Sequence, residues 1–182
     1  MTKAFLSGKR LALHGLKPDD FHINRMVDWL NDNEVTKLLI AGLLPANPED
    51  IREAWKSNIQ NPNEVVFMVY SGPVRDKFVG TAGLYLIDWV ARSTEYRIFL
   101  GNKEFWGEGL GTEVTKCIVK YAFEKLNLHS VYLGVNLGNK AAVRVYEKAG
   151  FVHEGTYRQV VYRNGQYYDA WHMSILREEY FA

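Results

Sequence analysis

The segment between Glu104 and Val114, EFWGEGLGTEV, restricts the possible folds more than any other part of the chain. It places glycines at three alternate positions, 107, 109 and 111, before apolar residues that recur at helical spacing: Leu110, Val114, Cys117, Ile118, Tyr121 and Ala122. Glycines at a helix entrance let backbone amides approach a ligand closely, and the helix dipole favours an anion there. The pattern predicts a phosphate-binding turn between a strand and a helix, with a glycine-rich turn that holds no ligand as the alternative.

Two better-known phosphate-binding motifs do not fit this segment. A Walker loop requires G-x-x-x-x-G-K-[ST], and no lysine stands at the required position. A dinucleotide-binding G-x-G-x-x-G turn follows the first strand of its domain and has an acid about 20 residues further on. Here the turn follows the fourth predicted strand and has no such acid. Only the general arrangement remains, in which amides at a helix N-terminus face a phosphate group.

The remaining hydrophobic patterns define the elements around this turn. Apolar runs predict strands at residues 9–16, 65–70, 77–88, 93–101 and 130–135, and a final two-stranded ribbon over residues 152–176 with Asn164–Gly165 at its tip. Helical patterns begin after Asp19 or Asp20, at residue 33, after Asn47, after the glycine turn, and at Asn139 with Gly150 as the stop. This order predicts one α/β domain over residues 1–182, with a mixed, mostly antiparallel sheet of about seven strands, a parallel pair at its centre and four or five flanking helices.

Composition and charge exclude several classes of function. The 22 basic and 21 acidic residues give a net charge of +1, so bulk charge gives no reason to expect binding to nucleic acid or to an acidic membrane. The single cysteine, Cys117, excludes an internal disulfide and favours a reducing compartment. No apolar segment approaches the roughly 18 residues of a membrane span, so we expect a cytoplasmic protein. The five histidines show no metal-binding spacing, so no metal is expected.

A second segment, NKAAVRVYEKAGF at residues 139–151, gives the glycine turn a partner motif. The two together resemble the GNAT superfamily of acyl-CoA-dependent N-acetyltransferases. WGEGLG is similar to that family's [Q/R]-x-x-G-x-[G/A] pyrophosphate loop, with Trp106 at the Gln/Arg position, and the second segment is similar to its N-x-x-A-x-x-x-Y-x-K-x-G-F motif. The likeness covers the whole chain. Through WLNDNEVTKLL, FWGEGLGTEVTKCIVKYAFEKLNLHSV and LREEY it is greatest to the branch that includes the Rim-type ribosomal-protein N-terminal acetyltransferases.

The resemblance implies a GNAT fold in which the fourth and fifth predicted strands separate and the cosubstrate acetyl-CoA lies in the gap. The pyrophosphate would then meet the glycine turn: Trp106, Gly107, Glu108, Gly109, Leu110, Gly111 and Thr112. The pantetheine arm would pair with Phe99, Leu100 and Gly101, as an added strand pairs with an open sheet edge, and would hydrogen-bond Asn139. Lys140 and Arg144 could meet the outer phosphates, although a solvated helix face is the stronger alternative.

The resemblance also suggests two catalytic residues. Tyr146 matches the family's tyrosine and would give a proton to the departing thiolate; the alternative is a core tyrosine that only packs its ring. Glu95 lies on the fourth predicted strand, where several family members carry a glutamate that acts as base, directly or through water. The alternative for Glu95 is an ion pair with Arg97.

The identity of the acceptor stays open at this level. A primary amine is expected, either the α-amino group of a protein or a small amine such as an amino-sugar nucleotide, a polyamine or an aminoglycoside. Five aromatic residues are candidate walls of the acceptor pocket: Trp29, Tyr85, Trp89, Tyr168 and Trp171. Exposed aromatics on the last strand could also form a homodimer contact. A non-catalytic acyl-CoA-binding protein of the same fold is the alternative function.

Overall fold

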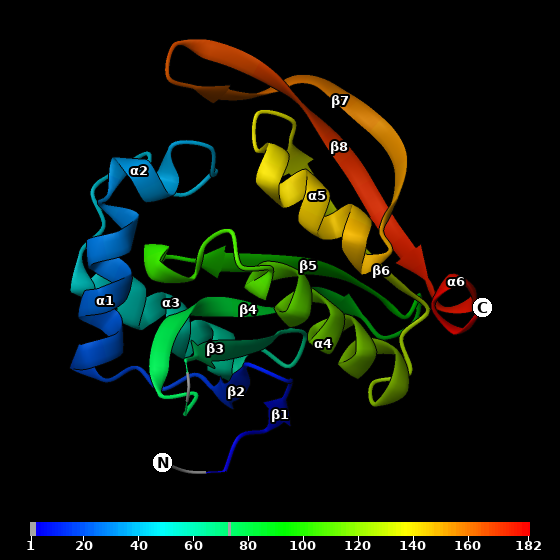
Figure 1. The fold of residues 1–182 in the computed structure, drawn as a ribbon, viewed down its shortest axis with the longest axis horizontal. Coiled ribbons are helices and arrows are strands. Elements are labelled where there is room, and N and C mark those ends of the chain that lie inside the picture. The colour runs from blue at the N-terminus through cyan, green and yellow to red at the C-terminus, as the bar shows by residue number, and fades with distance from the viewer. Residues whose placement is uncertain (1–2, 73) are drawn as a thin grey trace.

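The chain folds around one continuous sheet of eight strands, in the order β1-β2-β3-β4-β5-β6-β8-β7 (Figure 1). A computed structural model describes residues 3–72 and 74–182. The strands are β1 Leu6–Ser7, β2 Ala12–Gly15, β3 Val65–Ser71, β4 Lys77–Asp88, β5 Ser93–Leu100, β6 Ser130–Asn136, β7 Val152–Arg163 and β8 Gln166–Leu176. All neighbouring strands run antiparallel except β5 and β6, which are parallel. The predicted mixed sheet with a central parallel pair is confirmed.

The described residues contain six α-helices and one short 3-10 helix. They are α1 Asp20–Leu30, α2 Asn33–Thr36, α3 Pro48–Gln60, η1 Lys103–Phe105, α4 Leu110–Glu124, α5 Lys140–Ala149 and α6 Arg177–Phe181. The last helix follows β8, and the others lie between strands. None of the helices in the described residues is long and apolar enough to cross a membrane.

The local capping rules explain where the early helices begin. The side chain of Asp19, rather than that of Asp20, accepts a hydrogen bond from the amide of His22 and caps α1. Asn47 caps α3 and Pro48 occupies its first turn, as the sequence predicts. The second helix is shorter than expected, because α2 ends at Thr36 instead of continuing through residue 39. The first strand also differs, since a two-residue strand, β1, precedes β2 and is too short to show an alternating pattern.

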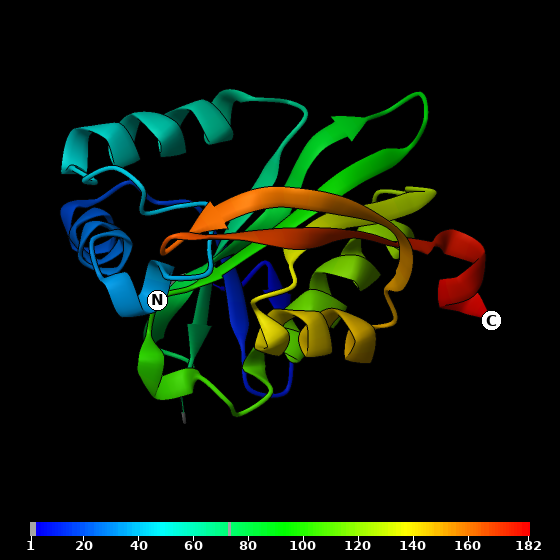
Figure 2. The same cartoon turned by 90° about the horizontal axis from the view of Figure 1, so that it is seen from above.

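Helices cover both faces of the sheet. Along β3, Phe67 and Val69 belong to the core cluster beneath α4 and α5, while Met68 packs with residues of α1 and α3. This alternation follows from the two-residue period of a strand. Seen from above, α1 and α3 lie on one side of the sheet, and α4 and α5 lie on the other (Figure 2).

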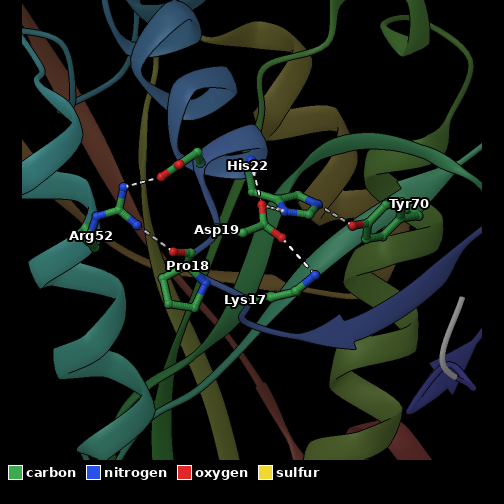
Figure 3. A network of polar contacts seen from close by, with 7 residues as sticks. Lys17, Pro18, Asp19, His22, Arg52 and Tyr70 are labelled. Carbon is green, nitrogen blue, oxygen red and sulfur yellow. Dashed lines mark hydrogen bonds and ion pairs between the residues drawn. The ribbon is translucent and has the colours of Figure 1, made fainter.

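A polar network fixes the N-terminal end of α1 to the sheet (Figure 3). The buried ring of His22 lies between Asp19 and Tyr70 of β3, with Nδ1 2.5 Å from Asp19 Oδ1 and Nε2 2.5 Å from the Tyr70 hydroxyl. From α3, Arg52 donates to the carbonyl oxygen of Pro18 and to Asp20 Oδ1, both at 2.7 Å. These hydrogen bonds fix the position of α1 relative to β3 and α3.

The hairpin of β7 and β8 holds the loop that follows α2. Asn164 and Gly165 form its tip with φ values of 50° and 80°, the left-handed pair that an Asn-Gly turn predicts. Arg163 donates to the carbonyl oxygens of Leu39 and Ile40, and Asn164 Nδ2 donates to that of Lys37 at 3.2 Å. Segments at opposite ends of the chain therefore lie side by side, as Figure 1 also shows.

The parallel pair separates soon after it forms. β5 and β6 are in register at only three positions, of which Glu95–Tyr132 is the last. Beyond it, β6 pairs only with β8, and residues 96–100 of β5 pair only with β4. The strands thus part at Glu95 and leave the backbone edge of residues 96–100 open toward β6. This is the expected gap between the fourth and fifth predicted strands, which are β5 and β6.

Candidate active site at the separated strands

The glycine turn brings unsatisfied amides to the open end of α4. Gly109 is the N-cap residue of α4, has a φ of 79°, and makes no side-chain capping hydrogen bond. The first amides of a helix lack partners within the helix, so the turn presents donors and the positive end of the dipole to an anion. Gly111 faces α5, where an added Cβ would make an ordinary van der Waals contact with Val145 Cγ2 at 3.4 Å, so helix packing alone does not require glycine at this position.

Trp106 ties the turn back to the end of β5. Its indole Nε1 donates to the carbonyl oxygen of Leu100 at 2.9 Å, while 39% of the residue stays exposed. This contact gives Trp106 a structural role at the position where the family pattern has Gln or Arg. It also engages one of the two acceptor positions of the Leu100 carbonyl, which we expected the pantetheine arm to use.

The end of β5 is shaped by a glycine under an indole ring. An added Cβ at Gly101 would lie 2.1 Å from the ring of Trp29, so only glycine permits this approach. Trp29 also packs on Phe99, with ring centroids 6.3 Å apart. α1 therefore borders the open edge of β5, and Trp29 is placed beside the predicted pantetheine segment.

The N-terminal half of α5 contributes three candidate residues: the N-cap Asn139, Lys140 in the first turn and Arg144 in the second. Asn139 Oδ1 accepts from the amide of Ala142 at 3.1 Å and caps the helix, which leaves the Nδ2 donor and one acceptor position of Oδ1 for the pantetheine arm. Lys140 and Arg144 are both exposed on the surface of α5. No ion pair ties down either cation within the described residues.

Tyr146 projects from α5 into the core beside β5. The residue is 8% exposed, and its ring meets Tyr96 edge-on, at 6.3 Å between centroids and 89° between planes. Burial raises the pKa of Tyr146 to about 12. The Tyr146 hydroxyl makes no hydrogen bond within residues 3–72 and 74–182. Every fully buried side-chain oxygen of these residues has a hydrogen-bond partner, so the Tyr146 hydroxyl oxygen must be partly accessible to solvent. A protonated phenol is thus held on the α4 and α5 side of the gap.

Glu95 lies at the fork of β5 and β6, on the other face of the sheet from Tyr96. It pairs across the strands with Tyr85 of β4 and with Tyr132 of β6. Arg97 holds its carboxylate in a two-pronged ion pair, with Nε 2.9 Å from Oε1 and Nη2 2.7 Å from Oε2. The ion pair with Arg97, which was the alternative to a catalytic role for Glu95, is therefore present in the structure. If Glu95 acts as a base, it does so while paired with Arg97.

The sheet brings three further residues to this face, of which only Arg97 was named from the sequence, as the ion-pair partner of Glu95, and Tyr132 and His172 were not. Arg97 lies over the Tyr85 ring at 4.7 Å, and Tyr132 packs on His172 of β8 at 5.6 Å between centroids. The alternation along β5 contained a usable signal, because residues 95, 97 and 99 of one strand must share a face. The register that places Tyr132 and His172 beside them could not be read from sequence.

The other predicted aromatic wall residues are scattered. Trp89 lies in the turn between β4 and β5, at the end of β5 away from Leu100, and donates to Asn63 Oδ1 at 3.0 Å. Trp171 packs against the core cluster beneath α4 and α5 and stacks on His153. Tyr168 lies against Gly138, next to the cap of α5. Tyr85 and Trp29 lie on the face of Glu95, so the structure groups only these two of the five.

Comparisons with known proteins give this arrangement a family. An acetyltransferase (GNAT) domain matches residues 10–152, and the matched stretch contains the glycine turn, the fork of β5 and β6, and α5. This chain belongs to the GNAT acetyltransferase family. Within the described residues, no group of three or more His, Cys, Asp or Glu side chains is arranged to hold a metal ion.

Similar proteins include enzymes with named acceptors. Spermidine N(1)-acetyltransferase of Vibrio cholerae is 32% identical over 132 residues, which is 72% of this chain and 75% of the relative. The putative ribosomal N-acetyltransferase YdaF of Bacillus subtilis is 29% identical over 179 residues, 94% of each chain. The crystal structure of the Vibrio cholerae enzyme with CoA and spermine superposes with a TM-score of 0.84 at 27% identity, over 96% of this chain and all of that one.

Three observations indicate the same acetyl donor: the family of the chain, the uncapped N-terminus of α4 and the open edge of β5. This GNAT protein is an N-acetyltransferase that uses acetyl-CoA. The amides at the start of α4 suit a pyrophosphate, and the free edge of residues 96–100 suits the amide groups of a pantetheine arm.

Proposed function

We propose that this GNAT protein transfers the acetyl group of acetyl-CoA to a small primary amine by direct attack in a ternary complex. The observation that carries the proposal is the separation of β5 and β6 at Glu95, which opens the sheet between the two faces. Tyr146 lies on the face of α4 and α5, and Glu95 lies on the face of α1. The donor would enter from the side of α4, and the amine would enter from the side of α1.

Within this proposal Tyr146 is the general acid. Acetyl-CoA supplies an activated acetyl group whose leaving group is a thiolate. A tyrosine with a pKa of about 12 keeps its proton throughout the physiological range and has it available for that thiolate. The ring contacts with Tyr96 and Phe151 fix the phenol in place, which limits the entropy lost on reaction.

Glu95 is the proposed general base, and how much the reaction gains from a base depends on the pKa of the acceptor amine. A lysine-like amine with a pKa near 10.4 is under about 0.1% neutral at pH 7, whereas an α-amino group near 7.8 is more than about a tenth neutral. A small aliphatic amine therefore gains more from a nearby carboxylate. The guanidinium of Arg97 occupies two of roughly four acceptor positions of the Glu95 carboxylate. The remaining positions are free to accept a proton from the amine or from a bridging water.

A protein α-amine is the second candidate acceptor. The likeness to the putative ribosomal N-acetyltransferase YdaF extends over 94% of both chains and supports it, as does the resemblance to the Rim-type branch. Likeness to spermidine N(1)-acetyltransferases, with identity of 32%, supports the small amine.

Self-association is a further proposal, supported by exposed tyrosines on the β7–β8 hairpin and by a dodecameric structure of the Vibrio cholerae enzyme.

A thiol-release assay tests the proposed function. Acetyl-CoA is incubated with the protein and a panel of small amines and short peptides with free N-termini. Release of CoA that depends on a small amine supports the proposal, and release only with peptides supports the second candidate. Tight binding of acetyl-CoA without release in any reaction would identify a non-catalytic acyl-CoA-binding protein.

A further inference from the structure

The side chain of Tyr96 carries a buried hydroxyl group that the proposed chemistry does not use. Tyr96 is the first residue of β5 beyond the fork, and it projects to the face of α4 and α5. Tyr96 and Thr115 of α4 are both buried. The Tyr96 hydroxyl lies 3.0 Å from Thr115 Oγ1, which in turn donates to the carbonyl oxygen of Gly111 at 2.7 Å. These two hydrogen bonds connect β5 to the first turn of α4.

The direction of the two hydrogen bonds follows from the protons available. A threonine hydroxyl has one proton, and Thr115 gives it to the carbonyl oxygen of Gly111. Tyr96 must therefore donate its own proton to Thr115. Burial raises the pKa of Tyr96 well above its ordinary value, so the phenol keeps that proton. Because the proton is engaged with Thr115, Tyr96 leaves the acid role to Tyr146.

The start of α4 is attached to the rest of the fold at few points. Its N-cap residue, Gly109, makes no side-chain capping hydrogen bond. An exposed ion pair attaches Glu113 of the first turn to Arg10, with Nε 3.1 Å from Oε2. Water and salt weaken an exposed ion pair, whereas a buried hydrogen bond is shielded from both. The attachment through Tyr96 is therefore the one that solvent does not weaken.

The ring of Tyr96 contacts the proposed general acid. It meets the Tyr146 ring edge-on at 6.3 Å between centroids. Phe151, which follows α5, packs on both rings, at 6.3 Å from Tyr96 and 5.8 Å from Tyr146. Tyr96 thus joins two parts of the donor site. Its hydroxyl acts on the turn that suits the pyrophosphate, and its ring acts on the phenol that faces the thiolate.

We propose that Tyr96 is a positioning residue that fixes the glycine turn at a set distance from the Tyr146 phenol. A flexible arm joins the pyrophosphate of acetyl-CoA to its thioester. Binding of the pyrophosphate therefore places the thioester only if the turn cannot shift relative to the acid. A misplacement of about 1 Å can cost on the order of 10²-fold in rate. This inference rests on the proposed function and adds a residue that acts through Thr115 and Gly111.

Three variants test the attachment through the binding of CoA. Tyr96→Phe removes the hydroxyl and keeps the ring against Tyr146. Thr115→Val removes the same attachment from the side of α4, whereas Thr115→Ser keeps the hydroxyl. We expect the Kd of CoA, measured by titration calorimetry, to rise about tenfold in Tyr96→Phe and in Thr115→Val, and to stay within about threefold in Thr115→Ser. The double variant should bind within about threefold of either single variant, because both changes break one attachment.

A truncated donor separates positioning from a general loss of structure. Acetyl-pantetheine carries the same thioester and lacks the pyrophosphate, so it does not engage the glycine turn. With butylamine as acceptor, we expect Tyr96→Phe to lower kcat/KM at least about tenfold for acetyl-CoA and less than about threefold for acetyl-pantetheine. The matched control is Tyr121→Phe, a buried tyrosine of α4 that packs on Phe5 and Phe67. The control should keep the wild-type Kd and both kcat/KM values.

The outcomes separate this inference from the proposed function. Equal falls with the two donors, or an unchanged Kd of CoA in Tyr96→Phe, would overturn the role of Tyr96 and leave acetyl transfer standing. Release of CoA from wild type with none of the amines would overturn the proposed function and this inference with it. If Tyr96→Phe does not fold, Thr115→Val and Thr115→Ser decide, and equal affinity of these two variants for CoA would overturn the inference.

Discussion

At the scale of single residues, the proposed mechanism depends most on Tyr146. Replacing it with phenylalanine keeps the buried ring and removes only the hydroxyl. Because a positioned general acid contributes about 10²–10⁴ in rate, we expect kcat to fall by at least about 10² with little change in the KM for acetyl-CoA. Steady-state thiol release measures both. The matched control is Tyr167→Phe, an exposed tyrosine on β8 that should behave as wild type. Full kcat in Tyr146→Phe would remove the acid assignment.

The raised pKa of Tyr146 makes a separate prediction about alkaline pH. An ordinary tyrosine loses its proton near pH 10, whereas burial raises the pKa of Tyr146 to about 12. The acid form therefore persists from neutral pH up to near pH 12. We expect no loss of kcat from tyrosine ionisation between pH 8 and about pH 10.5, measured in single-turnover reactions with acetyl-CoA already bound. A fall in kcat centred near pH 10 would show that the reacting phenol is not buried as described.

Residue roles were only partly predictable from sequence. The motif identified Tyr146 and the glycines, because both stand at fixed positions relative to one helix. It did not reveal that Trp106 bonds the carbonyl of Leu100, since that contact depends on the conformation of the whole turn. Nor did it show that Asn139 Oδ1 accepts a hydrogen bond from the amide of Ala142 and caps α5.

At the scale of elements, Gly109 sets the entrance of α4. Its φ of 79° is a left-handed conformation, so alanine there costs about 1–2 kcal/mol and displaces the first amides of the helix. We expect Gly109→Ala to raise the KM for acetyl-CoA about tenfold or more, measured by thiol release at saturating amine. Gly165→Ala is the matched control, because Gly165 has a φ of 80° at the hairpin tip with open space around it. The control should lose similar stability and keep its KM; an equal rise in both variants would contradict the role of the turn.

The start of α1 predicts a pH-dependent stability. Burial alone would raise the pKa of Asp19, but hydrogen bonds from the His22 amide, Lys17 and the His22 ring outweigh it and lower this pKa. A lowered pKa stabilises the fold above the ordinary carboxyl pKa of about 3.9, and the contribution is lost as pH falls through the lower folded value.

Asp19→Asn tests that contribution. Asparagine caps a helix about as well as aspartate, so the difference between the two reports the charge. We expect the free energy of unfolding to fall by about 0.5–1 kcal/mol at pH 7 and the difference to disappear in acid, once the pH lies below the lowered folded pKa of Asp19, in urea melts at pH 7 and at an acidic pH. Asp28→Asn on the exposed side of α1 is the control. A loss of equal size at both pH values would show that Asp19 acts only as a cap.

Elements were more predictable than their bounds. Asn47 and Pro48 before α3, and Asn164 and Gly165 at the hairpin tip, are local signals that the structure confirms. The early end of α2 has no local cause, because the loop after it is held from outside by Arg163 and Asn164 of the distant hairpin. Such tertiary contacts override helix propensity and are not visible in a single segment.

At the scale of the whole molecule, the separation of β5 and β6 joins the two faces of the sheet. The order of strands and helices predicted a central parallel pair, and the family resemblance implied that it splays. The position of the fork could not be predicted, because it depends on the pairing of β6 with β8 over its full length while β5 pairs with β6 at three positions. That register places Glu95 at the fork on the α1 face of the sheet, while Tyr146 lies on the opposite face, beside α4 and α5.

The amine-dependent release of CoA tests this account most directly. Single-turnover thiol release is measured with wild type and Tyr146→Phe, both saturated with acetyl-CoA, with and without butylamine or 4-aminobutyrate. The account predicts rapid release that requires the amine in wild type and release slower by at least about 10² in Tyr146→Phe. Amine-independent release, or equal rates in the two proteins, would contradict acetyl transfer at the fork of β5 and β6.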